Sequence, residues 1–288
     1  MDLDELQQKL KNNFINICCT NNINGRDIAN TELLKILIKK LENLGYENWT
    51  QPKLDKNDLR MQLFVKFDFY TSYYYHNMNL TIENYDNIVE DNLDLGYSYQ
   101  FTSESMIFKE VYERTNYLSK IYFDLEYFLQ QVNKKLSYVD FNKTKKKSHF
   151  FNSLINHIGI IKSININEII TEINNIYGNE LLYKVKNREV EFSIIFDYLT
   201  TFRNSLHNNG FSQKTLNKID FGGIPIEIKQ DQQVNINHCV LFILIFCQIV
   251  IFEKIVKKLL VDYPELWQDE YLNHIETKKK LFKKSDKN

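Results

Sequence analysis

Apolar residues recur at helical spacing along most of this chain. The longest such stretch covers residues 104–133, where one apolar stripe is formed by Ile107, Val111, Leu118, Ile121, Leu125, Phe128 and Val132. Residues 31–44 predict a shorter amphipathic helix, with Thr31 as its N-cap and Gly45 as its C-terminal stop. Further helices are predicted near residues 148–162, 166–177, 188–207 and 236–261.

The stretch from residue 56 to residue 101 allows two interpretations. Strand-like alternation is present at Leu63, Val65, Phe67 and Phe69. Helical spacing is present at Phe64, Phe67, Thr71, Tyr74 and Met78. We favour a helix here, followed by an extended segment from Tyr97 to Phe101.

A β-hairpin is predicted at residues 218–229, with Gly222 and Gly223 as a two-residue turn. In that register, one face of the hairpin carries the apolar side chains of Ile219, Phe221, Ile224 and Ile226. Pro225 confines its strand to a sheet edge, because proline has no backbone N–H to donate. The predicted fold class is therefore mainly α, a helical bundle with a short β-hairpin between the helix at 188–207 and the last long helix.

The predicted organisation has three parts. They are an N-terminal helical or mixed region, a helical bundle and a basic tail, at residues 1–103, 104–262 and 263–288. Within the chain, the basic connection at residues 142–148 is the best candidate for a boundary. One continuous bundle is the alternative.

Composition narrows the class of protein. The chain has 288 residues, 43% hydrophobic and 25% charged, with a formal net charge of −1. These values are typical of a soluble globular protein, and any nucleic-acid site must be a local patch. The four cysteines show neither metal-ligand spacing nor a disulfide framework. The N-terminus has no signal-peptide pattern, so we expect a cytoplasmic protein.

One apolar segment raises the question of a membrane. Residues 239–252 are apolar apart from Gln248. The segment is shorter than the roughly 20 residues that span a bilayer. We therefore expect no membrane contact and interpret the segment as a helix buried in a core or a dimer interface.

The stretch LTTFRNSLHNNGFS, residues 199–212, brings three polar residues together near a helix end: Arg203, Asn204 and His207. Arg203 and His207 are four residues apart and so share one helix face, beside the apolar stripe. One interpretation is purely structural. Cations in the last helical turn interact with the helix dipole by about 0.3–1 kcal/mol each, and an Asn-Gly end needs no further role.

The wider context favours chemistry. An Arg-Asn pair, a His one turn later, the sequence HNNG, a hairpin and another long helix together resemble the HEPN superfamily over roughly residues 104–262. The resemblance implies an α-helical bundle, and in many members a dimeric, metal-independent endoribonuclease that serves as a toxin or defence effector. Three residues separate Arg203 from His207, where the family usually has four to six. This departure bears on activity more than on fold.

These residue types suit RNA cleavage. The RNA 2′-hydroxyl is the nucleophile, His207 can act as base or acid, and Arg203 can grip phosphate oxygens. One motif supplies one His, so the hypothesis requires a homodimer in which two motifs face each other. Asn204 would orient a His or the phosphate. No cofactor or metal is expected, and an antitoxin or sensor protein is a possible partner.

The alternative is a non-catalytic HEPN-like module that binds nucleotide, RNA or a partner protein. Additional RNA contacts are predicted at Asn208, Lys145, Lys146 and Lys147. The aromatic-rich stretch at residues 67–77 is interpreted as core, with base stacking as the alternative. His149, His157 and His238 are weaker candidates because no acidic partner or ligand set accompanies them.

Overall fold

The computed structural model describes residues 23–48, 59–83, 87, 90, 99–136, 138, 147–160, 162–178, 180–186, 189–208, 210–234 and 237–263. The helices are α2 (Ile23–Asn48), α3 (Leu59–Glu83), α5 (Tyr99–Leu136), α6 (Lys147–Ile158), α7 (Ile166–Tyr177), α8 (Phe192–His207) and α9 (His238–Asp262). The strands are β1 (Ser163–Asn165), β2 (Glu189–Glu191), β3 (Leu216–Phe221) and β4 (Ile224–Ile228). The predicted mainly α fold is confirmed.

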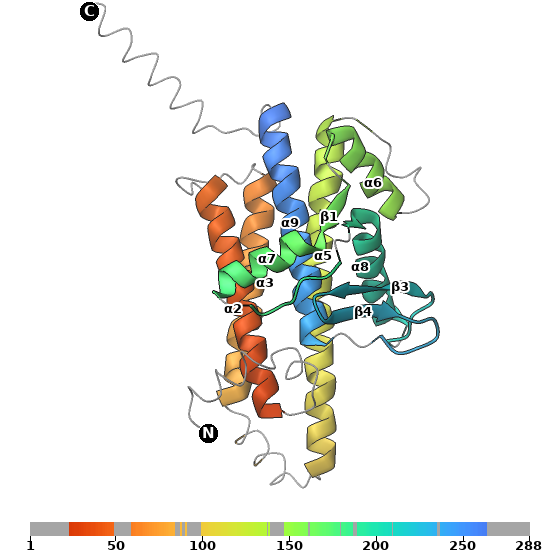
Figure 1. Ribbon diagram of the computed structural model, residues 1–288. Helices are drawn as coiled ribbons and strands as arrows, with labels where there is room; N and C mark the ends of the chain where they lie inside the picture. Colours follow the sequence, from red (N-terminus) through yellow and green to blue (C-terminus); the bar gives the residue numbers. More distant parts are fainter. Residues whose placement is uncertain are drawn as a thin grey trace, which may run out of the picture.

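The helix α9 lies at the centre of the bundle (Figure 1). It packs against α2, α5, α6, α8 and β4. Every residue from His238 to Phe252 is buried. By length and composition α9 could cross a membrane, but 89% of its most apolar window is buried inside the protein. The prediction of a buried core helix is therefore confirmed, and it follows from the lack of any polar face in this segment.

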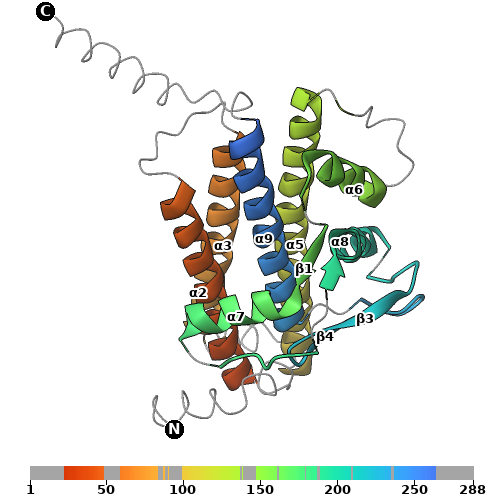
Figure 2. The same cartoon turned by 45° about the horizontal axis from the view of Figure 1, so that its top comes forward.

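The other helices pack around α9 on two sides. Figures 1 and 2 show α2 and α3 on one side, and α6, α8 and the β3–β4 hairpin on the other. α5 packs against α3, α8 and α9, and α7 lies across α2. One continuous hydrophobic core runs from Leu33 in α2 to Leu259 in α9. The N-terminal helices and the predicted C-terminal bundle thus bury their apolar faces together.

Two local predictions about helix ends were wrong. The first helix begins at Ile23 and continues to Asn48, so Thr31 does not precede it and Gly45 does not end it. An internal glycine costs a helix only about 1 kcal/mol, which the burial of the α2 apolar face offsets. Residues 99–101 are helical rather than extended, because α5 begins at Tyr99. Tyr97 lies outside the described residues. The helical interpretation of residues 59–83 is confirmed.

The hairpin has the predicted register. Phe221 pairs with Ile224 and Ile219 with Ile226. Gly222 and Gly223 have φ angles of 66° and 101°, the positive values that a type I′ hairpin turn requires. Sequence patterns missed a second sheet, in which β1 pairs antiparallel with β2. Its three-residue strands are too short for an alternation signal, and residues 189–191 were assigned to the following helix.

Candidate functional site

The apolar face of α8, the helix with the Arg203–His207 motif, fixes it in the bundle. Helical spacing predicts an apolar stripe of Ile195, Tyr198, Leu199, Phe202 and Leu206. The first four are buried, and the side chain of Leu206 lies outside the described part. Tyr198 also connects α8 to the hairpin. Its hydroxyl lies 3.0 Å from the carbonyl oxygen of Ile226 and within hydrogen-bond reach of the Asn217 carbonyl. The helix α8 therefore has a defined position against α5 and, through Tyr198, against the β3–β4 hairpin.

Arg203 leans against α5 rather than into open solvent. Its side chain is 22% exposed, and its Nη1 lies 3.9 Å from Glu126 Oε2. Its guanidinium carbon lies 4.6 Å from the ring centroid of Phe123. The distance to Glu126 permits an ion pair but exceeds hydrogen-bond reach. Within the described part of the chain, the buried Nε of Arg203 has no hydrogen-bond partner. The guanidinium is thus packed between a ring and a carboxylate of α5.

Glu126 and Phe123 belong to the site, although the sequence did not single them out. The Glu126 side chain is 5% exposed, and its Oε1 accepts a hydrogen bond of 3.2 Å from Gln130. Phe123 is 45% exposed. The sequence feature that could have identified Glu126 is its position next to the apolar stripe of residues 104–133, where a carboxylate comes close to the core.

The neighbouring hydroxyl of Tyr122 belongs to the structural part of this region. It is 2.9 Å from the Thr200 hydroxyl of α8. Burial raises the pKa of Tyr122, and the hydrogen bond to Thr200 offsets only part of that effect. This phenol therefore stays protonated near neutral pH and ties α5 to α8.

The end of α8 is closed by backbone and side-chain hydrogen bonds. Asn204 is exposed, and its carbonyl oxygen accepts a hydrogen bond of 3.0 Å from the Asn208 side chain. The backbone N–H groups of Asn208 and Gly210 both donate to Ser205 O, at 3.0 and 2.8 Å. Gly210 has a φ of 85°, which glycine adopts without strain. Asn208, predicted to bind RNA, thus has a capping role at this helix end.

Several predicted site residues lie at the edge of what the structure describes. His207 is the last residue of α8, four positions after Arg203, but its side chain lies outside the described part. Lys145 and Lys146 also lie outside the described residues. Lys147 opens α6, and its side chain is not among those described. The structure therefore brings Arg203, Asn204 and the backbone of His207 together at one helix end.

The remaining histidines and cysteines form no second site within the described part of the chain. The His157 ring stacks on Tyr138 with 3.8 Å between centroids. His238 is buried at the start of α9, and the His149 side chain lies outside the described part. Burial raises the pKa of the Cys247 thiol, which disfavours a reactive thiolate. No three His, Cys, Asp or Glu side chains among the described residues gather closely enough to hold a metal ion.

The aromatic-rich stretch at residues 67–77 divides between core and surface. Phe67 and Tyr74 are buried, as the core interpretation predicted. Phe69 and Tyr73 are 59% and 54% exposed. Their rings stack on each other with an angle of 18° between planes and 6.0 Å between centroids. This half of the stretch is therefore surface, where base stacking remains available.

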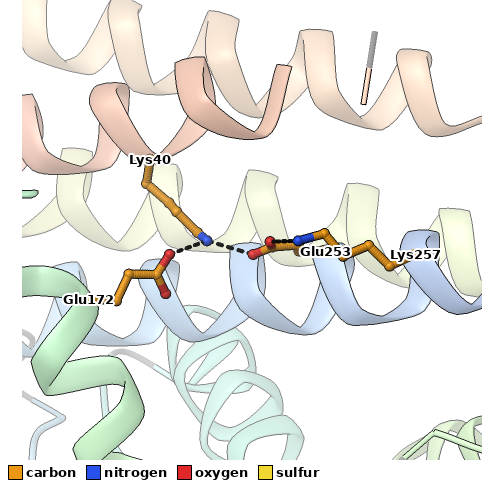
Figure 3. Close-up of polar contacts among 4 residues, drawn as sticks. All are labelled: Lys40, Glu172, Glu253 and Lys257. Carbon is orange, nitrogen blue, oxygen red and sulfur yellow. Dashed lines mark hydrogen bonds and ion pairs between the residues drawn. The ribbon is translucent and has the colours of Figure 1, made fainter. Parts of the chain in front are cut away.

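A charged cluster far from the motif was not predicted. Figure 3 shows the Lys40 ammonium of α2 between the carboxylates of Glu172 in α7 and Glu253 in α9. The Lys40 side chain is 6% exposed and lies 2.5 Å from Glu253, which also accepts a hydrogen bond of 2.6 Å from Lys257. Burial would raise the pKa of Glu253, but the two lysines lower it below its ordinary value. The cluster holds three helices together.

Comparison of the chain with protein-family models, with curated proteins and with solved structures found no match.

Proposed function

We propose that this protein is a metal-independent endoribonuclease of the cytoplasm that acts as a homodimer. The observation that carries the proposal is the state of Arg203. Its guanidinium lies against Glu126 and Phe123 at the end of α8, and 22% of its side chain remains exposed. A guanidinium that is held in place and partly exposed suits an anionic oxygen of a phosphate.

The reaction in this proposal needs only side chains and the RNA itself. One histidine accepts the proton of the 2′-hydroxyl, whose oxygen attacks phosphorus. A second histidine donates a proton to the departing 5′-oxygen, so that a 2′,3′-cyclic phosphate remains. Arg203 stabilises the negative charge that develops on the phosphate oxygens. Because each chain brings one His207, the second histidine comes from a second copy. Asn204 orients the phosphate or a histidine.

The wider biological role in this proposal is that of a toxin or antiviral effector. The predicted contacts of Asn208, Lys145, Lys146 and Lys147 hold the RNA backbone. The N-terminal region receives a trigger or a partner such as an antitoxin or sensor protein. Its support is that α2 buries its apolar face in the same core as α9, so a change at α2 reaches the bundle directly.

A second candidate is a non-catalytic helical module that binds nucleotide, RNA or a protein. The observation that favours it is the ion pair between Arg203 and the buried carboxylate of Glu126. In this reading the pair mainly attaches α8 to α5, and the Asn208–Gly210 segment only ends the helix. The two candidates differ in whether the histidine is needed for a reaction.

The test is RNA cleavage by the purified chain in EDTA, beside His207→Ala, Arg203→Lys and the control His157→Ala. The endoribonuclease proposal expects cyclic-phosphate ends from the wild type and the control. It expects a loss of about a hundredfold or more for His207→Ala, the usual contribution of acid–base catalysis. Arg203→Lys also loses most activity, because an ammonium cannot reproduce the guanidinium fork. Equal cleavage by wild type and His207→Ala would refute the proposal, and thermal melts check that each variant is folded.

A further inference from the structure

Exposed aromatic rings gather on the surface where α3 and α5 pack together. Phe69 and Tyr73 of α3 are 59% and 54% exposed, and Phe123 and Tyr127 of α5 are 45% and 49% exposed. Here we call these four residues, together with the partly exposed Tyr70, the aromatic band. Large apolar groups that gather on a surface are typical of a binding site, whereas isolated ones are ordinary.

The same two helices also bury aromatic rings. Their aromatic residues are therefore divided between a buried face and an exposed face. Phe67 and Tyr74 of α3, and Tyr117 and Tyr122 of α5, are buried in the core. Each helix thus has one aromatic face turned inward and another turned outward. The inward rings form part of the core, and the outward rings leave large apolar surface exposed.

Cations lie over the rings of the band and connect its helices. Lys66 Nζ of α3 lies 5.7 Å from the ring centroid of Tyr127 in α5. Lys120 Nζ of α5 lies 5.5 Å from the centroid of Tyr70 in α3. Arg203 of α8 lies over Phe123, as described above. The band therefore reaches from α3 across α5 to the motif, with a positive charge beside a ring at each step.

Negative charge limits the electrostatic part of any binding. Lys66 also pairs with Asp124 at 2.6 Å, and Glu126 faces Arg203. A strongly basic groove would draw any polyanion, duplex or single strand, through its phosphates. The band has five rings, whereas two of the three cations that lie over them, Lys66 and Arg203, already face carboxylates. Stacking of flat groups should therefore supply more of the affinity than charge does.

We propose that the aromatic band binds single-stranded RNA, with bases stacked on its rings and the backbone leading toward Arg203. The bases of a single strand present free faces to aromatic side chains, whereas those of a duplex are already stacked on each other. The lysines over the rings meet the phosphates between stacked bases. The direction toward Arg203 rests on the proposed function, because that is where cleavage would occur.

The test is fluorescence anisotropy with a labelled oligouridine and a labelled hairpin duplex of equal length, in EDTA. The full chain carries His207→Ala, so that no substrate is consumed. Tyr127→Leu and Phe69→Leu remove a ring but keep an apolar group. Tyr183→Leu is the matched control, because Tyr183 is a 53% exposed aromatic residue outside the band. Tyr127→Phe keeps the ring and removes only the hydroxyl.

The proposal expects tighter binding of the single strand than of the duplex, and about a thirtyfold loss for each band variant, the middle of the range for one stacked base. Tyr183→Leu and Tyr127→Phe should bind like the parent. Equal affinity for duplex and single strand, an equal loss in Tyr183→Leu, or no binding at all would overturn it. The last outcome would also be expected if the band packs against another protein.

The failure of this inference differs from the failure of the proposed function. If RNA binding depends on the band but the wild type cleaves no RNA, the nuclease proposal is refuted and the proposal of RNA binding by the band stands. Cleavage that Tyr127→Leu and Phe69→Leu leave unchanged, with no preference for single strands, would refute the band and keep the nuclease.

Discussion

Lys40 and Arg203 are both cations withdrawn from solvent, but their donors are used differently. The Lys40 side chain is 6% exposed and contacts two carboxylates, with Glu253 at 2.5 Å (Figure 3). Arg203 is 22% exposed, and its carboxylate partner lies 3.9 Å away. Lys40 is therefore closely paired inside the bundle, whereas Arg203 is loosely paired and stays partly exposed.

The comparison teaches how to separate a structural charge from a functional one. A buried charge is tolerated when its partners satisfy it, and Lys40 meets that condition. Arg203 Nε is buried without a hydrogen-bond partner in the described part of the chain. Such a donor calls for an explanation, which can be strain, a ligand or a bound water. The predictions below test whether the two cations differ in this way.

The largest effect on stability is expected for Lys40→Met. The substitution keeps the apolar stem and removes the ammonium, which leaves the partly buried Glu253 with Lys257 alone. We expect the free energy of unfolding to fall by about 2 kcal/mol. This is less than the roughly 3–5 kcal/mol for a fully buried pair, because Glu172 regains water. Urea denaturation at neutral pH measures the change.

The matched variant is Arg203→Met, with an expected loss of about 1 kcal/mol, because the guanidinium lies 3.9 Å from the buried Glu126 and the Arg203 side chain is itself 22% exposed. The variant with the larger effect on stability should have the smaller effect on RNA binding. Arg203→Met should weaken the complex with single-stranded RNA, whereas Lys40→Met should leave it unchanged. Equal stability losses would assign Arg203 to the structure and favour the non-catalytic candidate.

The local structure around Arg203 was predictable from the sequence. The helix that carries Arg203, its buried stripe and the following hairpin were all predictable, because helical and strand periods repeat over several residues. The capped end of α8 follows from those local patterns. The pairing of Arg203 with Glu126 and Phe123 was not predictable, because it depends on how α5 packs against α8.

The ion pairs of Lys40 could not be predicted from the sequence for the same reason. It lies in the amphipathic helix predicted at residues 31–44, where a lysine beside another lysine is ordinarily a solvated residue. Only the packing of α7 and α9 against α2 brings Glu172 and Glu253 to it. A single helix cannot indicate which of its polar residues a distant helix will cover.

A smaller effect is expected when the wild type and Lys40→Met are compared at lower pH. Burial would raise the pKa of Glu253, but Lys257 and Lys40 together lower it. A lowered pKa in the folded state contributes stability above the ordinary value of 4.5, and that stability is lost as the pH falls through the folded pKa. We therefore expect the stability difference between the two proteins to narrow below about pH 4.5.

Urea titrations at several pH values measure this difference. Other carboxyl groups, such as Asp68, whose pKa burial raises, titrate in both proteins and cancel in the difference. A gap that stays constant into acid would mean that the loss in Lys40→Met does not come from the ion pair with Glu253.

The smallest effect is expected for Lys35→Ala in α2. Lys35 lies 2.6 Å from Glu32, much closer than Arg203 lies to Glu126, but the two side chains are 52% and 32% exposed. Water screens such a pair, so the free energy of unfolding should change by less than about 0.5 kcal/mol, and the high helix propensity of alanine offsets part of that. The same urea assay measures it. If Lys35→Ala lowered the free energy of unfolding as much as Arg203→Met, the distance within an ion pair would matter more than its burial in this protein. The contrast drawn between Lys40 and Arg203 would then be wrong.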